Sequence, residues 1–301
     1  MDRSLQVFLT VAKTLNFSRA AEELHLTQPG VSLHIQSLEK HYKTKLLDRT
    51  NKYVRLTPAG EILFQQGQEI MNQYARTKRL IDDLTQSAQG HLAIGASFTF
   101  GEYILPGIIS GFWERYPNIT PAITIENTRD IGERVVQGEL DVGIVEGELH
   151  HGDLVIHPIA TDELVLILPV DHRLAGQKEI NLAEVSNEHW ILREKGSGTR
   201  SAADQMFKHH GLTPGSVMEF GSNQVIKESV ETGLGISIIS RWAIQKELTL
   251  GAFSQLRIRE YPIMRHFYSL THASSFHTKA MDLFLIYLRK LLHTDLPQRD
   301  L

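Results

Sequence analysis

Residues 18–39 read Ser18-Arg19-Ala20-Ala21-Glu22-Glu23-Leu24-His25-Leu26-Thr27-Gln28-Pro29-Gly30-Val31-Ser32-Leu33-His34-Ile35-Gln36-Ser37-Leu38-Glu39. This pattern predicts two short amphipathic helices, over about 18–25 and 28–41, joined by a tight turn. Ser18 and Thr27 are predicted to cap them, because their hydroxyls can accept hydrogen bonds from first-turn N–H groups. Pro29 falls in the first turn of the second helix, where a missing N–H costs nothing. Two such helices, with small residues where they cross, are typical of a helix-turn-helix.

The second helix has two contrasting faces. At 100° per residue, Val31, Ile35 and Leu38 share one face and are expected to meet the core. The outer face is short-chained and polar and carries no acid, a composition that suits base edges and thymine methyl groups in the major groove. The residues predicted to contact DNA on this element are Thr27, Gln28, Pro29, Ser32, Leu33 and Gln36. A three-helix scaffold without a nucleic-acid role is the alternative.

Flanking segments extend this motif. Residues 5–12 carry the apolar pattern of a preceding helix, and a run of positive charge follows the pair, at Lys40, Lys43, Lys45, Arg49, Lys52 and Arg55. Short apolar segments at 46–47 and 53–56 predict two strands of a β-hairpin "wing". Arg49, Lys52 and Arg55 are predicted to bind phosphates there, which fixes register without reading sequence. A solvated charged hairpin is the alternative.

Charge and composition bound the possible classes. The 301 residues carry a net charge of −4, yet residues 1–60 hold nine Lys/Arg against five Asp/Glu, whereas the rest holds 22 against 30. This split predicts that only the basic head meets a polyanion. The absence of cysteine excludes disulfides, thiolate metal sites and cysteine nucleophiles. No signal peptide or membrane-length apolar run is found, so a cytoplasmic protein is expected.

A long helix is predicted from Thr57-Pro58 to about residue 87. Its positions four and three apart form a seam like that of a coiled coil: Leu63, Gly67, Ile70, Tyr74, Thr77, Ile81 and Leu84. Such a seam favours dimerisation. Packing against the chain's own body is the alternative.

Beyond a predicted hinge at Gln89-Gly90, strands and helices alternate, which predicts a parallel sheet covered on both faces. The expected strands lie at 91–96, 121–126, 140–145, 163–168, 190–193, 217–220, 236–239 and 266–271. The expected helices lie at 101–116, 129–137, 199–210, 223–231 and about 275–293. Two α/β lobes fit this count, with Asp162 and Met264 as the points where the chain crosses between them.

Ligands of open α/β sheets bind at the carboxyl ends of strands. Hydroxyl-rich helix starts and a Gly-Ser-Gly-Thr stretch occur at such ends, and their N–H and hydroxyl groups suit a small oxyanion. The predicted effector-binding residues are Ser97, Phe98, Thr99, Thr128, Glu146, Ser197, Gly198, Thr199 and Arg200. Glu146 is expected either to repel a larger or dianionic ligand or to pair with Arg200. Ordinary helix caps and a plain loop are the alternative interpretation.

Catalytic and metal chemistry are not predicted. The Gly-Ser-Gly-Thr stretch lacks the spacing and the Lys of a P-loop and the spacing of a hydrolase elbow. His150-His151 and His209-His210 are adjacent pairs whose side chains point apart, without a carboxylate–histidine set at ligand spacing. We therefore expect no catalytic residue, no metal and no cofactor.

The chain resembles the LysR-type transcriptional regulators over nearly its whole length. The most specific positions are residues 16–21, Leu24, residues 26–32, Ile35 and Leu38-Glu39, followed by Leu46-Leu47-Asp48-Arg49 and Leu56-Thr57-Pro58-Ala59-Gly60. Leu47 replaces a more usual aromatic residue, and Leu33-His34 stands where many members carry Arg-Gln. Residues 95–106, 126–128, 140–147, 193–200 and 233–237 resemble the branch with regulators of sulfite and cysteine metabolism and of carbon fixation.

The resemblance implies an α+β multidomain chain: a winged helix-turn-helix (1–58), a linker helix (59–88) and a two-lobed effector domain like a periplasmic binding protein. Lobe I is expected at 91–161 and 265–301, and lobe II at 162–264. The resemblance also implies a homotetramer on a promoter dyad of double-stranded DNA, contact with RNA polymerase, and a bacterial cytoplasmic protein on the nucleoid when bound. A small-molecule inducer between the lobes, such as a sulfite- or sulfate-like anion, would control it. The alternative is a cytoplasmic anion-binding protein or enzyme whose N-terminal bundle does not bind DNA.

Overall fold

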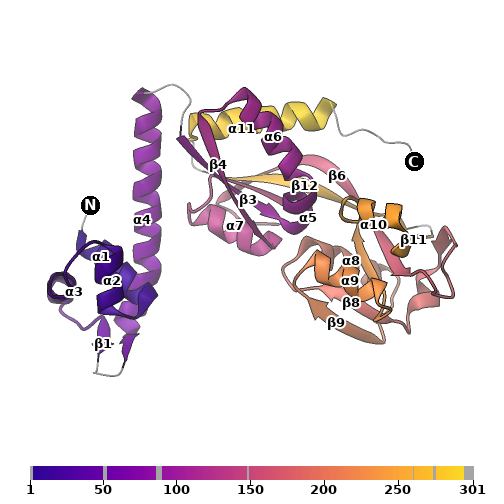
Figure 1. Cartoon of the computed structure of the whole chain (residues 1–301), viewed down its shortest axis with the longest axis horizontal. Coiled ribbons are helices and arrows are strands. Elements are labelled where there is room, and N and C mark those ends of the chain that lie inside the picture. The colour runs from indigo at the N-terminus through magenta and orange to yellow at the C-terminus, as the bar shows by residue number, and fades with distance from the viewer. Residues whose placement is uncertain are drawn as a thin grey trace. The chain divides into compact units, whose positions relative to one another are not determined.

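The computed structural model describes residues 3–49, 53–85, 90–147, 149–259, 261–273 and 276–294 (Figure 1). Contacts divide the chain into two compact units, Met1–Ile81 and Asp82–Leu301. Thr50, Asn51 and Lys52 of the predicted wing lie outside the described residues, as does Gln89 of the predicted hinge.

The N-terminal unit begins with three helices, α1 (Arg3–Thr14), α2 (Phe17–Glu23) and α3 (Gln28–Tyr42). Thr27 caps α3 as predicted, since its Oγ1 accepts a hydrogen bond from the Gly30 N–H at 3.2 Å. The predicted Ser18 cap is wrong. Asn16 caps α2 instead, because its extended backbone lets Oδ1 accept from the N–H groups of Ser18 and Arg19.

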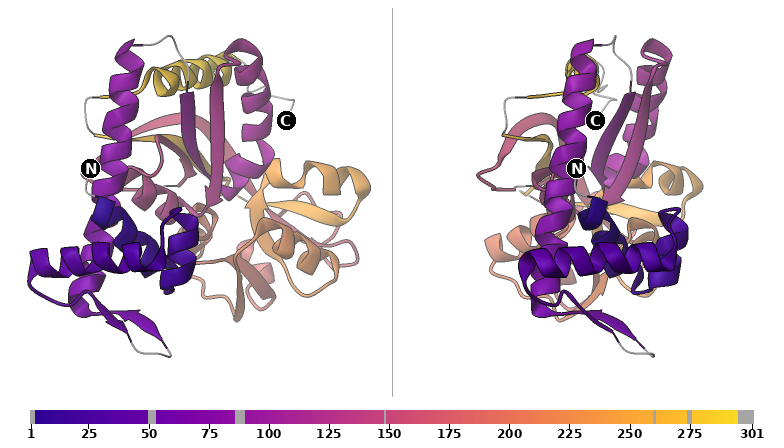
Figure 2. Two further views of the ribbon diagram at one scale, coloured as in Figure 1. Left: turned by 60° about the vertical axis from the view of Figure 1, so that its left-hand side comes forward. Right: turned by 90° about the vertical axis from the view of Figure 1, so that its left-hand side faces the viewer.

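The predicted wing is present as an antiparallel pair, β1 (Leu47–Arg49) and β2 (Val54–Leu56), which Figure 2 shows below the helices in both views. Helix α4 (Pro58–Thr85) follows, and Thr57 caps it through a 3.0 Å bond from the Gly60 N–H. Gly60 allows close approach at this junction, since a Cβ there would lie 2.0 Å from the Leu46 carbonyl oxygen. The hairpin and α4 are thereby fixed on the helix-turn-helix.

The predicted seam of α4 divides into two parts. Leu63 and Gly67 are buried inside the unit, and a Cβ on Gly67 would meet the side chain of Leu5 at 2.9 Å. Ile70, Tyr74 and Ile81 are each more than half exposed. The start of the seam therefore packs on the unit's own core, whereas Ile70, Tyr74 and Ile81 remain uncovered within this unit, and the Leu84 side chain lies outside the described ones.

The C-terminal unit contains a large mixed sheet with the order β4-β3-β5-β12-β6-β11-β7, with β10 also paired to β6. Its strands are β3 (Gly90–Ser97), β4 (Ile119–Glu126), β5 (Val142–Glu146), β6 (Leu154–Pro169), β7 (Glu179–Ile180), β10 (Ser237–Ser240), β11 (Phe253–Ile258) and β12 (Ile263–His272). A separate parallel pair is formed by β8 (His189–Arg193) and β9 (Ser216–Phe220). The all-parallel expectation is wrong, because β6 and β12 pair antiparallel with each other and β12 pairs antiparallel with β5.

Helices cover both faces of the β4-β3-β5 segment. Helices α6 (Leu105–Arg115) and α11 (Lys279–Thr294) pack on one side, and α7 (Thr128–Val136) packs on the other, as Figure 1 shows. The single helix predicted at 101–116 is wrong. It breaks at Ile104 between α5 (Phe98–Tyr103) and α6, because Pro106 cannot donate a hydrogen bond back to the preceding turn.

The β4-β3-β5 segment and its covering helices form one α/β layer of this unit. A second α/β layer is built around β8, β9 and β10. Its helical elements are α8 (Gly198–His209), α9 (Asn223–Glu231), α10 (Gln245–Leu250) and the short 3₁₀ turns at Leu182–Val185 and Arg241–Ile244. Two apolar clusters fill it, one around Trp190 and one around Ile226.

Strands β6 and β12 run from one layer to the other. In their antiparallel register Asp162 lies opposite Arg265, and Met264 lies opposite Glu163. The sequence predicted crossings at Asp162 and Met264, so the predicted positions fall on the two strands that connect the layers. This pairing places the buried guanidinium of Arg265 at the junction of the two layers.

Candidate DNA-binding surface and effector site

The outer face of α3 is available for contact. Val31, Ile35 and Leu38 are buried in the core of the unit, as the helical period predicts. Thr27, Gln28, Pro29, Leu33 and Gln36 are exposed and Ser32 is half-buried. The Gln28 side-chain nitrogen lies 3.5 Å from the Ser32 Oγ, so these two polar groups sit together on the surface.

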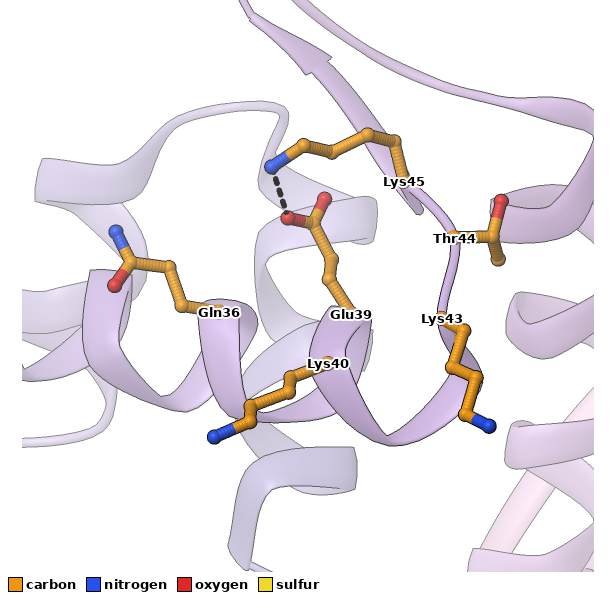
Figure 3. A pocket seen from close by; sticks show the side chains of 6 residues that line it. All are labelled: Gln36, Glu39, Lys40, Lys43, Thr44 and Lys45. Atoms are coloured by element: carbon orange, nitrogen blue, oxygen red, sulfur yellow. Dashed lines mark hydrogen bonds and ion pairs between the residues drawn. The ribbon is translucent and has the colours of Figure 1, made fainter.

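A basic pocket lies at the end of α3 (Figure 3), lined by Gln36, Glu39, Lys40, Lys43, Thr44 and Lys45. Lys45 Nζ is 2.7 Å from Glu39 Oε2, whereas Lys40 and Lys43 point away from that ion pair in Figure 3. Both side chains are exposed and suit phosphate contact. Lys40 and Lys43 were not among the predicted DNA contacts, although the run of positive charge noted after Glu39 includes both residues.

The described wing residues make defined local contacts. The Arg49 guanidinium lies 5.5 Å from the centroid of the Phe17 ring. Arg55 lies over Tyr53 and 3.5 Å from Asp48 Oδ2, with both partners of that ion pair more than half exposed. Arg49 and Arg55 are thus held at the surface of the hairpin by weak contacts that phosphate groups can replace.

In the C-terminal unit, the predicted effector residues come together where strand ends meet α8. Gly198 lies against the end of β5, because a Cβ on it would be 2.0 Å from the Glu146 carbonyl oxygen and 2.7 Å from Glu146 Cγ. The Arg129 N–H donates to the Gly196 carbonyl at 3.3 Å, which joins the start of α7 to the loop before α8. The two layers are therefore in contact at this point.

Arg265 occupies the centre of this junction, and the sequence did not single it out. Its Nη1 donates to Thr199 Oγ1 at 2.9 Å and its Nη2 donates to Thr99 Oγ1 at 3.1 Å. Its Nε donates to Asp162 Oδ2 at 2.8 Å. One guanidinium thus links the two predicted hydroxyls. The available signal was a lone arginine between the predicted crossing point at Met264 and the strand predicted at 266–271.

The carboxyl groups around Arg265 are almost fully buried. Glu146 Oε1 lies 3.7 Å from Arg265 Nη1, and the hydroxyl of Ser240 donates to Asp162 Oδ1 at 2.7 Å. Burial raises the pKa of Glu146 and of Asp162 above their ordinary values, and the charge of Arg265 opposes this in both cases. The cluster therefore combines two buried carboxyls, each with a raised pKa, with one permanent cation.

Arg200 does not belong to this cluster. Its Nη1 bonds Glu219 Oε2 at 2.8 Å and its Nε bonds Asp204 Oδ1 at 3.0 Å. The expectation that Glu146 pairs with Arg200 is wrong, because the ion pair of Glu146 is with Arg265. The Arg200 side chain reaches Asp204, one turn further along α8, and Glu219 on β9.

Arg193, at the end of β8, is a further buried cation. It lies 4.4 Å over the ring of Phe98, bonds Glu194 through Nε at 2.8 Å and donates to Asn223 Oδ1 at 3.1 Å. Phe98 thus acts as an apolar wall beside a guanidinium. Arg193 also lowers the pKa of Glu146, so it faces the same cluster.

Some predicted hydroxyls have internal partners and others do not. Thr128 Oγ1 donates to the Glu146 carbonyl at 2.8 Å, and Ser97 Oγ lies 3.4 Å from the Ile144 carbonyl. Among the side chains that the structure describes, five buried polar atoms lack a hydrogen-bond partner: Ser197 Oγ, Glu146 Oε2 and Asn223 Nδ2 near this junction, and His210 Nε2 and Gln255 Oε1 away from it. Buried polar atoms are normally satisfied, so this concentration at one junction indicates a site for a polar ligand.

Within the described ranges, no group of three or more acidic or histidine side chains is placed to hold a metal ion. No helix within those ranges has both the length and the apolar character needed to cross a bilayer.

Known proteins match both parts of the chain. The family model described as "LysR substrate binding domain" matches residues 85–292, and "Bacterial regulatory helix-turn-helix protein, lysR family" matches residues 3–61. The HTH-type transcriptional regulator CysL of Bacillus subtilis is 38% identical over 285 residues, covering 95% of each chain. The RuBisCO operon transcriptional regulator of Acidithiobacillus ferrooxidans is 33% identical, covering 94% of this chain and 92% of that one.

Two solved structures are informative. The regulatory domain of Synechocystis CcmR in complex with 2-PG is 32% identical, covers 68% of this chain and 99% of that one, and superposes with a TM-score of 0.63. Full-length CbnR with its target DNA is 20% identical and covers 96% of this chain and 99% of that one, with a TM-score of 0.74, which shows the shared fold. The chain belongs to the LysR family: it is a DNA-binding transcriptional regulator whose α/β part is a small-molecule effector domain.

Proposed function

We propose that the effector of this regulator is a small anion, such as a sulfur oxyanion, bound at the start of α8. The observation that carries the proposal is that Ser197 is 2% exposed and that its buried Oγ has no hydrogen-bond partner among the described residues. Ser197 is the N-cap of a 12-residue helix but makes no side-chain cap bond. Its hydroxyl and the free first-turn N–H groups therefore suit an anion.

Charge supports the same assignment. Arg265 and Arg193 bring two guanidinium groups to the junction, and an anion can take the Thr99 and Thr199 hydroxyls that Arg265 now holds. When the anion replaces these hydroxyls as the acceptor of the Arg265 N–H groups, little free energy is lost, because Arg265 keeps its charge-assisted hydrogen bonds. The other predicted ligand contacts, Ser97, Phe98, Thr128 and Gly198, remain part of this proposal, whereas Arg200 is left out of it because it pairs with Asp204 and Glu219.

The relatives favour a small anionic effector without fixing which one. CcmR binds 2-PG through a regulatory domain 32% identical to this chain. An effector changes the output only as far as it binds two states of the protein differently. We infer that anion binding at the contact between Gly198 and Glu146 changes how closely the two layers approach.

Oligomerisation and partners complete the proposal. Ile70, Tyr74 and Ile81 on α4 form the uncovered part of the seam, and a second copy of α4 can bury them. We infer a dimer built through α4, a tetramer on a promoter dyad, and contact with RNA polymerase. The domain limits 1–58, 59–88, 91–161 with 265–301, and 162–264 belong to the same proposal.

The test is thermal denaturation of the full chain with sulfite, sulfate, thiosulfate, phosphate, 2-PG and short carboxylates. At least one anion is expected to raise the midpoint by several degrees, because a ligand at about 100 times its Kd adds roughly 2.7 kcal/mol. Ser197→Ala and Thr99→Ala are expected to abolish most of that shift.

The matched control is Ser201→Ala, which removes an exposed hydroxyl one turn further along α8. It should leave the shift intact. A shift that survives both Ser197→Ala and Thr99→Ala would place the effector elsewhere.

A further inference from the structure

Glu146 is a buried carboxyl of this cluster, and one of its two oxygens lacks a hydrogen-bond partner among the described residues. It ends β5, is 1% exposed, and its Oε2 has no partner among the described residues. A buried acceptor without a donor costs about 1–3 kcal/mol, and more when it is charged. The effector is the group that can supply the missing partner.

Both guanidinium groups that face Glu146 in the described part of the chain already have other hydrogen-bond partners. Arg265 directs Nε to Asp162, Nη1 to Thr199 and Nη2 to Thr99 and Asp162, and it approaches Glu146 Oε1 only at 3.7 Å. Arg193 bonds Glu194 and Asn223. Glu146 Oε2 therefore remains unsatisfied although two guanidinium groups face its carboxyl.

The groups facing Glu146 come from several elements. They are Arg265 on β12, Asp162 on β6, Arg193 on β8 and the Thr99 hydroxyl on α5. Across the junction, the backbone of Gly198 lies against its Cγ. The carboxyl is thus enclosed beside the start of α8, where the anion is proposed to bind.

We propose that Glu146 selects an effector that carries its own proton or hydroxyl, such as a monohydrogen oxyanion, and rejects a fully deprotonated one such as sulfate. The inference rests on the proposed oxyanion site. A hydrogen bond between Glu146 Oε2 and an oxygen of the effector requires that one of the two oxygens carries a proton. Hydrogenphosphate or hydrogensulfite brings that proton and donates it to Oε2. Sulfate brings none, so a proton must be taken from solvent onto the carboxyl.

The experiment measures binding of inorganic phosphate and of sulfate to the full chain by calorimetry near neutral pH. Wild type is expected to prefer phosphate by about tenfold or more, the equivalent of one unsatisfied buried acceptor. Glu146→Gln replaces the acceptor with an amide that can donate, so the preference is expected to fall at least about tenfold. Glu102→Gln, an exposed acid on α5, is the matched control and should keep the preference.

A second readout does not depend on a variant. Repeating wild-type titrations in two buffers of different ionisation enthalpy counts the protons exchanged. At a pH well above the second pKa of phosphate, where hydrogenphosphate is the main species, uptake of about one proton is expected with sulfate and close to none with phosphate. If Glu146→Gln fails to fold, this proton count alone decides the proposal.

The outcomes separate the two proposals. If neither anion binds wild type or the variant, and no other anion of the thermal screen does, the oxyanion site is wrong and this inference falls with it. If anions bind but Glu146→Gln leaves the preference unchanged, or wild type takes up no proton with sulfate, the site stands and the selector role of Glu146 is overturned. A wild-type preference for sulfate overturns it equally.

Discussion

Replacing Arg265 by leucine is expected to lower the free energy of unfolding of the C-terminal unit by about 3–5 kcal/mol at neutral pH. The guanidinium is 5% exposed and holds Asp162, Thr99 and Thr199 at once. Its loss leaves two buried carboxyls without their cation and two hydroxyls without their donor. Denaturant unfolding followed by tryptophan fluorescence measures this directly, because Trp113, Trp190 and Trp242 all lie in this unit.

The loss should depend on pH in a defined direction. Burial raises the pKa of Glu146 and of Asp162, so the folded state holds protons that the unfolded chain releases. Their contribution to stability is present below the ordinary carboxyl pKa of about 4 and is lost as pH rises through the raised pKa values. Without Arg265 both values rise further. The loss of unfolding free energy caused by Arg265→Leu is therefore expected to become smaller as the pH is lowered.

Arg257→Leu is the matched control, since Arg257 pairs with Glu163 on the same sheet but is 42% exposed at its side chain. It should cost about 1 kcal/mol or less. Adding Asp162→Asn to Arg265→Leu should recover part of the stability. Equal costs for Arg257→Leu and Arg265→Leu would contradict the central role of Arg265.

Gly198→Ala is expected to separate the start of α8 from the end of β5. The new methyl would lie 2.0 Å from a backbone oxygen of Glu146, which cannot rotate away as a flexible side chain can. Overpacking of this kind costs about 1–3 kcal/mol. Because Ser197 and Thr199 move with Gly198, we also expect the effector-induced thermal shift to be lost.

The comparison variant is Gly107→Ala, inside α6, where a Cβ would meet nothing within 4 Å. Alanine is favoured over glycine in a helix by up to about 1 kcal/mol, so this change should raise the melting temperature. An unchanged midpoint and an intact effector response in Gly198→Ala would show that the contact at Glu146 is dispensable.

The sequence predicted local elements well where one periodicity dominates. Helix α3, its Thr27 cap and its buried Val31, Ile35 and Leu38 were confirmed, as were the hairpin and α9 at 223–231. The cap of α2 was missed because Asn16 and Ser18 are both good capping residues two positions apart. Only the backbone conformation decides between them.

Long-range pairing was less accessible. Strand alternation alone suggested a parallel sheet, because it gives no information on the direction of β6 and β12. The same limit hid Arg265, which reaches Thr99 and Thr199 from 166 and 66 residues away. The starts of α3, α4 and α9 carry local signals and were identified, whereas a buried ion cluster appears only once distant strands are paired.

Binding to the DNA upstream of the protein's own gene tests the central account most directly. Gel-shift titrations should use that fragment and a scrambled one, over a range of salt, with wild type and with a variant carrying Gln28→Ala and Ser32→Ala. Specific affinity is expected to fall about 100-fold in the variant, at roughly 1–3 kcal/mol per base contact, while non-specific affinity stays nearly constant. Gln6→Ala, an exposed change on α1, should alter neither. Equal losses on both fragments, or no salt-sensitive preference of wild type for the upstream DNA, would contradict the account.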